Sequence, residues 1–184
     1  MRLKEKYEKE VVPKMKEILS VKSRMAVPKI EKVVLNIGFG KEVAGKSSQE
    51  RKKIQQQFVD DLALISGQLP VLTKAKSSIS SFKIRKGMEI GAKVTLRGKR
   101  MYDFLDRLIH ISLPRSRDFR GILLKSFDKK GNLTIAVKEH ISFPEILPEK
   151  IKKIFSFEVT VITTAKNKEQ SIELFKLLGF PIKS

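Results

Sequence analysis

Cysteine is absent from the 184-residue chain, and histidine occurs only twice, as His110 and His140. Without cysteine the chain can form no disulfide, no thiolate nucleophile and no Cys-ligated zinc site, and this composition fits a reducing compartment such as the cytoplasm. The two histidines are far apart in the sequence, and no carboxylates are arranged around them as metal ligands would be. No nucleophile is accompanied by a placed base. We therefore expect no catalytic residue, no metal ion and no cofactor.

Long apolar runs are also missing, because no stretch reaches the roughly 18 apolar residues that suggest a membrane-spanning helix. The N-terminus, MRLKEKYEKE, alternates charges where a secretory signal would be apolar. We expect a soluble protein without a membrane partner. The length suits a single domain over residues 1–184, and the 41% hydrophobic content is enough for a core. Within this single domain we expect an N-terminal helical segment over residues 1–26 and a protruding basic loop over residues 73–90.

Acidic residues are scarce: 20 Asp and Glu stand against 39 Lys and Arg, which gives a net charge of +19. Self-repulsion of this size destabilises a compact fold and is typical of proteins that bind a polyanion, above all nucleic acid. The excess is densest from Thr73 to Lys125, with 14 basic and 4 acidic residues. This stretch begins with TKAKSSISSFKIRKG, which holds five cations, five hydroxyls and no acid. A solvated loop is the simplest interpretation of such a run, and an RNA contact is the alternative.

Hydrophobic periodicity predicts alternating strands and helices. A polar helix over residues 2–19 should be broken or kinked at Pro13, because proline disrupts a helix interior. A second apolar stripe, from Tyr102 to Ile109, should end before Pro114. The other expected helices cover residues 47–66, stopped by Gly67, and about 168–178, closed by Gly179. Strands are expected at residues 30–37, 71–75, 91–97, 132–138 and 157–163.

Alternation along these strands predicts the architecture. In GAKVTLR, Val94 and Leu96 lie on one face of the strand and the polar residues lie on the other, so that one face is exposed to solvent. A sheet with one covered and one solvated face is mostly antiparallel. We therefore expect an α+β fold, a two-layer sandwich whose helices pack on one face of a mostly antiparallel sheet. Its open face would display Lys32, Asn36, Lys93, Thr95 and Arg97.

The segment GKEVAGKS, residues 40–47, matches the phosphate-loop pattern G-x-x-x-x-G-K-S between a strand and a helix. In a P-loop NTPase, Lys46 would reach the terminal phosphates and Ser47 would hold magnesium. Three observations oppose that interpretation. The preceding strand is too polar for the buried parallel sheet of a nucleotide fold, no apolar strand ends in an Asp for the magnesium, and Ser47 with Glu50 forms a helix capping box. A nucleotide site is the weaker alternative.

Several long segments closely resemble the bacterial form of large-subunit ribosomal protein five, a 5S rRNA-binding family. They are VPKIEKVVLNIGFG, LISGQLPVLTKAKSSISSFKIRKGMEIGAKVTLRG, MYDFLDRLIHISLPRSRDFRG, SFDKKGNLTIAVKEHISFPEI, ITTAK and LLGFP. The resemblance covers about residues 27–181 and implies an α+β fold with an antiparallel sheet. It also implies a structural role, without enzyme activity, in the large ribosomal subunit of the cytoplasm. The GKS sequence is not a feature of that family, in which this loop varies; this favours coincidence for the phosphate-loop pattern, with a local specialisation as the alternative.

The resemblance implies a set of partners and sites. The partners are 5S rRNA, which the family docks into the central protuberance, 23S rRNA, peptidyl-site tRNA, small-subunit protein thirteen and neighbouring 5S rRNA-binding large-subunit proteins. The family's contacts with 5S rRNA match Asn36, Gln68 and Thr95 here. Strand parity adds Lys32, Lys93 and Arg97. The tRNA contacts expected in the basic loop are Lys74, Lys76, Ser77, Ser78, Lys83, Arg85 and Lys86.

The residue types in these sites favour a particular mode of RNA recognition. The strands IEKVVLNI and GAKVTLR carry no Phe or Tyr, so base stacking on the sheet is not expected. Amides, hydroxyls and cations suit the phosphates and ribose edges of a structured RNA. The apolar residues of the basic loop, Ile79, Phe82 and Ile84, would anchor its base. Three further cations, Arg115, Arg117 and Arg120, either contact RNA or pair with Asp118. A solvated strand face and a generic basic chaperone or DNA-coating protein remain the alternatives.

Overall fold

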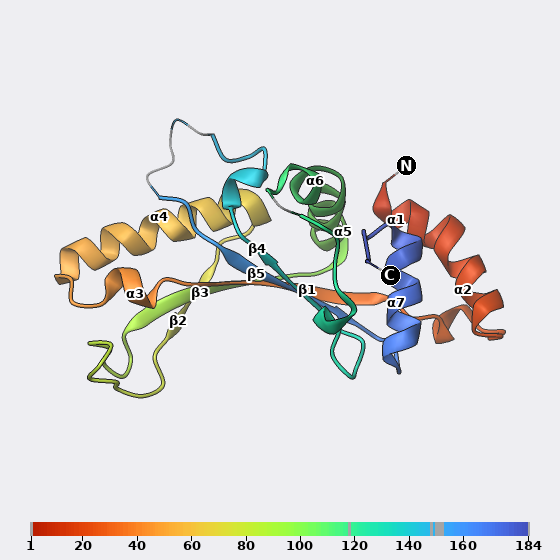
Figure 1. Ribbon diagram of the computed structural model, residues 1–184, viewed down its shortest axis with the longest axis horizontal. Helices are drawn as coiled ribbons and strands as arrows, with labels where there is room; N and C mark the ends of the chain where they lie inside the picture. The colour runs from red at the N-terminus through yellow and green to blue at the C-terminus, as the bar shows by residue number, and fades with distance from the viewer. Residues whose placement is uncertain (1, 118, 148, 150–152, 184) are drawn as a thin grey trace.

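The computed structural model describes residues 2–117, 119–147, 149 and 153–183. Its centre is a five-stranded sheet in the order β2-β3-β1-β5-β4, and every neighbouring pair is antiparallel (Figure 1). The strands are β1 (Ile30–Gly38), β2 (Val71–Lys74), β3 (Glu89–Leu96), β4 (Leu133–Val137) and β5 (Phe157–Thr163). The predicted α+β fold with an antiparallel sheet is confirmed, and each predicted strand is present.

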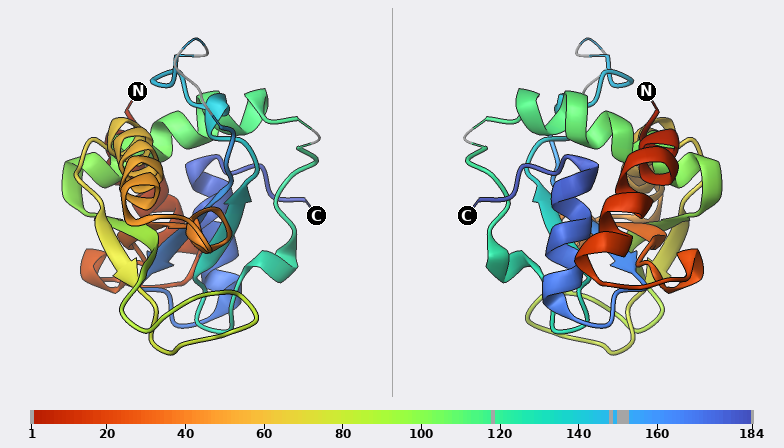
Figure 2. Two further views of the ribbon diagram at one scale, coloured as in Figure 1. Left: turned by 90° about the vertical axis from the view of Figure 1, so that its left-hand side faces the viewer. Right: turned by 90° about the vertical axis from the view of Figure 1, so that its right-hand side faces the viewer.

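Helices cover one face of this sheet. In Figure 1, α4 (Ser48–Ser66) and α5 (Gly98–Arg107) lie above the strands. At one end of the molecule, α7 (Lys168–Leu178) packs beside the N-terminal helices α1 (Leu3–Lys6) and α2 (Val12–Ile18), as the right-hand view in Figure 2 shows. Two short helices, α3 (Gly40–Val43) and α6 (Leu113–Arg115), complete the covered side. Among the described residues, no helix is both long and apolar enough to cross a membrane.

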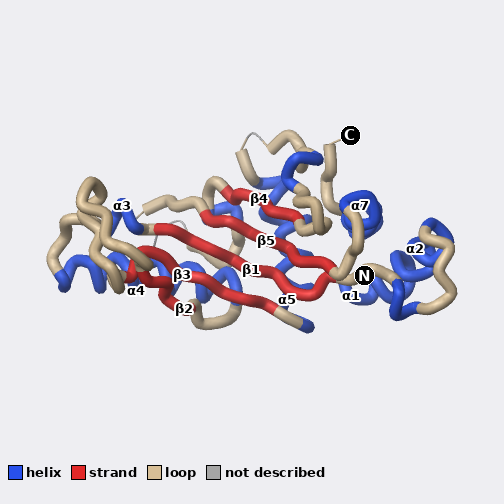
Figure 3. Tube along the Cα trace, turned by 90° about the horizontal axis from the view of Figure 1, so that it is seen from below, coloured by secondary structure: helices blue, strands red, loops and turns tan. Residues whose placement is uncertain are grey.

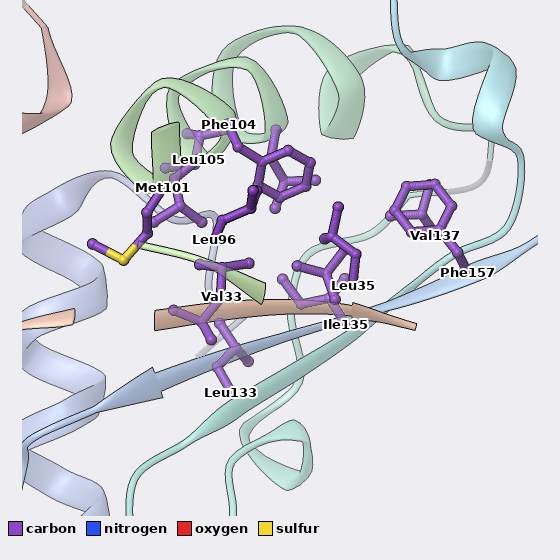
Figure 4. Close-up of a cluster of buried hydrophobic side chains, with 14 of the residues drawn as sticks. Val33, Leu35, Leu96, Met101, Phe104, Leu105, Leu133, Ile135, Val137 and Phe157 are labelled. Carbon is purple, nitrogen blue, oxygen red and sulfur yellow. The ribbon is translucent and has the colours of Figure 1, made fainter. Parts of the chain in front are cut away.

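The core lies between the strands and these helices. Along β1, Val33, Leu35 and Ile37 alternate with exposed or half-buried residues, and each is at most 1% exposed. Leu96 of β3 and Phe104 of α5 are also fully buried, and Figure 4 shows them meeting the β1 side chains. Burying such side chains contributes about 1.5 to 3 kcal/mol each, so the alternation determines which sheet face is covered.

The two ends of α4 follow from its sequence. The Ser47 hydroxyl accepts from the Glu50 N–H at 3.3 Å, and the Glu50 carboxylate accepts from the Ser47 N–H at 3.0 Å. This is the predicted capping box. Gly67 ends the helix with φ 67°, a left-handed conformation that glycine adopts without a Cβ penalty.

Neither of the two prolines in helical segments ends its helix. The helix around Pro13 is not broken, because a π turn over Tyr7–Val11 joins α1 to α2. The prediction that the second helix ends before Pro114 is wrong: a π turn over Leu108–Ser112 carries it on into α6. The proline ring clashes with the carbonyl four residues earlier, and in both cases that carbonyl belongs to the π turn. The wider turn accommodates the ring and lets the helix continue.

Candidate nucleic-acid interface

The second face of the sheet is open. Seen from below in Figure 3, the strands lie in front and α4 and α5 lie behind them. Asn36 is exposed at the centre of this face, opposite Lys93 of β3 on one side and Glu158 of β5 on the other. Thr95 and Val34 form the next row, which continues into Thr160. The structure therefore brings Asn36, Lys93 and Thr95 together, as strand parity predicts.

Lys32 and Arg97 lie further from this centre. Lys32 pairs in register with Ile162, next to an irregularity in β1, and its ammonium lies 3.8 Å from the carboxylate of Glu31. Arg97 follows β3 directly, is exposed, and stands at the N-cap position of α5. Both residues extend the polar face toward the end of the sheet where α5 begins.

Glu158 is a charged member of this face that the sequence interpretation missed. It is exposed and lies opposite both Asn36 and Ala136. The alternation in FEVTVIT places Glu158 on the outward side with Thr160, so strand parity could have identified it. A carboxylate repels phosphates but accepts hydrogen bonds from ribose 2′-hydroxyls and base amino groups. A face that combines this carboxylate with amide and hydroxyl groups is suited to ribose or base edges more than to phosphates alone.

Gln68 lies at the edge of the sheet, in the turn between α4 and β2. The Ser66 hydroxyl fixes this turn, since it accepts from the Gln68 N–H at 3.2 Å and donates to the Gln68 carbonyl at 2.8 Å. The Gln68 side chain stays half-buried. Three residues later, Val71 pairs with Lys93. The turn therefore leads into the same row of residues that contains Asn36.

The basic loop forms a structured arm over residues 75–88, which projects below the sheet (Figures 1 and 2) and lines a pocket together with the first turn of α4. At its base, the Ala75 N–H donates to the Met88 carbonyl at 2.8 Å, and the Gly87 N–H donates to the Ala75 carbonyl at 2.9 Å. Near its tip, Ile79 and Ile84 exchange two main-chain hydrogen bonds of 2.9 and 3.1 Å. These bonds shape the arm as a hairpin.

All seven predicted tRNA contacts on and beside the arm are exposed; they are Lys74, Lys76, Ser77, Ser78, Lys83, Arg85 and Lys86. Within the described ranges, none of the five cations among them forms an ion pair. Ser78 is partly engaged, because its hydroxyl accepts from the Lys86 N–H at 2.9 Å. A surface with this charge and no acidic partner is suited to phosphates.

The prediction that the apolar residues of the arm anchor its base is wrong for Phe82 and Ile79. Phe82 is 60% exposed and Ile79 is 42% exposed, and both lie at the tip. The base is held instead by the buried Ala75 and by the main-chain bonds around it. The hairpin register pairs Ile79 with Ile84 near the tip, and of these two only Ile84 is half-buried, close to Gly40 of α3.

The GKEVAGKS segment does not form a phosphate loop. Its amides are already used: those of Val43 and Ala44 donate to Phe39 and Gly40, and that of Lys46 donates to Val43. At the start of α4, the Ser47 and Glu50 amides bond to each other's side chains. The hydrogen bonds from the Ser47 backbone and then its hydroxyl lower the pKa of Glu50, so a carboxylate occupies the helix N-terminus. The antiparallel sheet also differs from a nucleotide fold.

The surroundings of both histidines are those of side chains with a structural role. His140 is fully buried and stacks on Phe155 with ring centroids 3.9 Å apart, while His110 is exposed beside Asp106. In the part of the chain that the structure describes, no three His, Cys, Asp or Glu residues are grouped as metal ligands.

A third basic surface flanks the edge strand β4. Arg115, Arg117 and Arg120 are exposed, and the last two line a pocket of about 430 Å³ with Lys138 and Lys183. The proposed pairing partner, Asp118, lies outside the described residues.

Comparison with known proteins gives consistent matches. A family model described as "Ribosomal protein L5" matches residues 23–85, and a second model, which describes the C-terminus of the same ribosomal family, matches residues 89–182. The chain is 53% identical over 180 residues to "Large ribosomal subunit protein uL5" of Thermoanaerobacter sp. (strain X514), covering 98% of this chain and 97% of that protein. The protein of the same name from Halothermothrix orenii is 49% identical over 179 residues, with 97% of each chain covered. That from Lacticaseibacillus casei is 51% identical over 180 residues, covering 98% and 97%.

Proposed function

Because the chain belongs to the ribosomal protein L5 family, we propose that it binds 5S rRNA, helps attach it to the central protuberance, and contacts peptidyl-site tRNA through the arm. The chain is a structural protein of the large ribosomal subunit, not an enzyme, and it resides in the ribosomes of the cytoplasm.

The single observation that carries the proposal is the uncovered sheet face. One face of the sheet holds the core, while the other presents Asn36, Lys93 and Thr95 to solvent without a covering layer. Asn36 offers amide donors and an acceptor, and Thr95 offers a hydroxyl, so both suit ribose and base edges. Lys32, Lys93 and Arg97 supply charge for the flanking phosphates, and Gln68 extends the contact at the edge. This surface is the proposed 5S rRNA site.

The arm is the proposed tRNA site. Its five cations sit on exposed stems with no ion-pair partner in the described ranges, so phosphate binding breaks no existing salt bridge. The exposed Phe82 at the tip adds an aromatic surface that RNA bases or a ribose can contact. The arm leaves the sheet between β2 and β3, so both proposed sites belong to one rigid antiparallel ladder.

Contacts with 23S rRNA, small-subunit protein thirteen and the neighbouring 5S rRNA-binding proteins complete the proposal. Arg117 and Arg120, with Lys138 and Lys183 beside β4, form a basic surface at the opposite sheet edge from the arm. We assign this surface to 23S rRNA, because its charge suits a third RNA contact.

The test separates the two main sites by substitution. One variant combines Asn36→Ala with Lys93→Gln, and a second combines Lys74→Gln, Lys76→Gln and Lys86→Gln. The expected result is that the first lowers affinity for 5S rRNA, and the second lowers the salt slope of tRNA binding by about 2 to 3, since each phosphate contact contributes about 0.7 to 0.9. Binding is measured by fluorescence anisotropy across a salt series.

A matched control removes three charges elsewhere, at the exposed Lys9, Lys14 and Lys53. If this control weakens tRNA binding as much as the arm variant, net charge alone explains the affinity and the arm assignment is lost. If the sheet variant binds 5S rRNA like the unchanged protein, the sheet is not the 5S rRNA site.

A further inference from the structure

The GKS segment, residues 45–47, and the arm line a common pocket. Two cations of this pocket, Lys46 and Arg51, are not among the proposed RNA contacts. The pocket has a volume of about 640 Å³ and is open to solvent. Its wall combines three parts of the chain: the turn between α3 and α4, the first turn of α4, and the arm. The lining residues that carry the argument are Gly45, Lys46, Arg51, Ser78, Lys83 and Arg85.

The charge of this pocket is entirely of one sign. Four cations converge there, two from the body of the protein and two from the arm, together with the hydroxyls of Ser78 and Ser80. None of the residues lining it is acidic. Cations held this close repel one another unless an anion lies between them. Ammonium, guanidinium and hydroxyl donors in one cavity are the groups that bind phosphate oxygens.

Arg51 provides a second, independent observation. Its Nε atom is buried and has no hydrogen-bond partner among the described residues. A buried donor without an acceptor costs free energy, and such donors are rare in folded proteins. An anion in the pocket supplies the missing acceptor. The site does not depend on the dipole of α4, since Ser47 and Glu50 already bond to the first amides of that helix.

The body and the arm touch at this point. A Cβ added at Gly45 would lie 3.6 Å from Cδ of Lys83, so the Lys83 stem passes over Gly45. Both residues have left-handed backbones, with φ 74° at Gly45 and 52° at Lys83. This conformation is uncommon for a lysine, and it turns Lys83 toward the GKS segment. A phosphate bound here would join Lys83 and Arg85 of the arm to Lys46 and Arg51 of the body.

We propose that the pocket binds a phosphate group, carried by an RNA backbone or by a free nucleotide, and that this phosphate clamps the arm to α4. The GKS segment then has a role in phosphate binding through side chains, although its amides form no phosphate loop. With RNA as the source, the inference rests on the proposed function and adds Lys46 and Arg51 to the RNA contacts.

The experiment compares a pocket variant, Lys46→Gln with Arg51→Gln, against a charge-matched control, Lys14→Gln with Lys53→Gln, whose lysines are exposed and do not line the pocket. Affinities for tRNA and for 5S rRNA are measured at several salt concentrations. In parallel, the Arg51 Nε–H resonance of the unchanged protein is followed by NMR during titration with inorganic phosphate, pyrophosphate and ATP.

An RNA source predicts that the pocket variant binds RNA more weakly than the control at 0.1 M salt, and that this difference shrinks at 1 M salt. Between the two salt concentrations the ratio of the two affinities should change by about fivefold to tenfold, the effect of one phosphate contact. A free-nucleotide source predicts a saturable shift of the Arg51 resonance with ATP or pyrophosphate, and no extra loss of RNA affinity. Either result supports a phosphate site and identifies its source. The proposal is overturned if the pocket variant binds RNA like the control and no phosphate probe moves the resonance.

Two further comparisons keep the outcome clear. Thermal unfolding checks that the pocket variant folds, and the single change Lys46→Gln, at an exposed side chain, replaces it if it does not. The arm variant at Lys74, Lys76 and Lys86 changes no residue that lines the pocket. If the arm variant weakens tRNA binding while the pocket variant behaves like its control and no phosphate probe moves the Arg51 resonance, only the pocket proposal fails. If neither variant affects RNA binding, the proposed arm function fails as well.

Discussion

At the scale of single residues, His140 shows how burial controls protonation. Its side chain is fully buried, it stacks on Phe155, and its Nδ1 accepts from the Phe155 N–H at 3.3 Å. The proton of the neutral ring therefore sits on Nε2, which lies 3.9 Å from the carboxylate of Asp61. Burial lowers the pKa of His140, and burial likewise raises the pKa of Asp61. Each group is thus favoured in its neutral form.

This arrangement predicts that the protein loses stability as the pH falls below about 6.5. In that range an unfolded histidine gains a proton while buried His140 resists it, so the unfolded state binds more protons. The free energy of unfolding should fall by up to about 1.4 kcal/mol per pH unit below that value. Asp61 acts in the opposite sense, because its raised pKa lets the folded state bind a proton where an unfolded Asp is already ionised.

Urea unfolding at pH 7.5, 6.5 and 5.5 measures the effect. His140→Gln should remove most of the pH slope, and His110→Gln is the matched control because it leaves the buried His140 unchanged. An unchanged slope in His140→Gln would contradict the assignment to His140.

At the scale of elements, the missing side chain of Gly91 leaves room for β1 and β2 on either side of β3. A Cβ added there would lie 2.6 Å from the carbonyl oxygen of Ile37 and 2.7 Å from Oγ1 of Thr73. Gly91 pairs with both Gly38 and Thr73, so the added methyl would push on two neighbouring strands. We predict that Gly91→Ala lowers the free energy of unfolding by about 1 to 3 kcal/mol through overpacking.

Gly38→Ala is the matched control for this prediction, because it lies directly opposite Gly91 and a Cβ there would meet nothing within 4 Å. It should change stability by no more than about 0.5 kcal/mol. Equal effects of the two substitutions in urea unfolding would show that the close approach is relieved by a small strand shift.

Elements with strong local signals were predictable from the sequence, and elements set by tertiary context were not. The end of α7 at Gly179 and the α4 capping box follow from local chemistry, and both are confirmed. The π turns before Pro13 and Pro114 were missed because proline normally ends a helix and π turns are rare. The exposed Phe82 was assigned to the arm base because an aromatic side chain usually packs inward, whereas the hairpin register decides its place.

The residues of the candidate site likewise fall into those that a local pattern predicts and those that depend on tertiary contacts. Asn36, Lys93 and Thr95 share a face because strand parity is a local property, and it could be derived from the alternation alone. The position of Glu158 opposite Asn36 depends on β5 pairing with β1, which no local pattern specifies. The meeting of Arg51 with Lys83 depends on how the arm folds back onto α4, so the pocket could not be predicted from the sequence.

At the scale of the whole molecule, the two family models meet inside the arm, between residues 85 and 89, yet the sheet is shared across that boundary. The first segment supplies β1 and β2, and the second supplies β3, β4 and β5. In the sheet, β1 lies between β3 and β5, and β2 pairs only with β3 among the described strands. Neither segment can therefore complete its hydrogen-bond ladder alone. We propose that residues 1–184 form one domain.

The corresponding prediction is that fragments 1–80 and 81–184, produced separately, lack a cooperative unfolding transition. Fragment 1–80 would leave β1 without either neighbour, and the apolar side chains of Val33 and Leu35 would be exposed to water. Mixing equal amounts should restore the sheet, seen as hydrogen-exchange protection of the β1 amides. The matched control is the intact protein cleaved after folding between Ser80 and Ser81 at the exposed arm tip, which should keep its protection because β1 already has both partners. Protected β1 amides in fragment 1–80 alone would show that the first segment is a domain by itself.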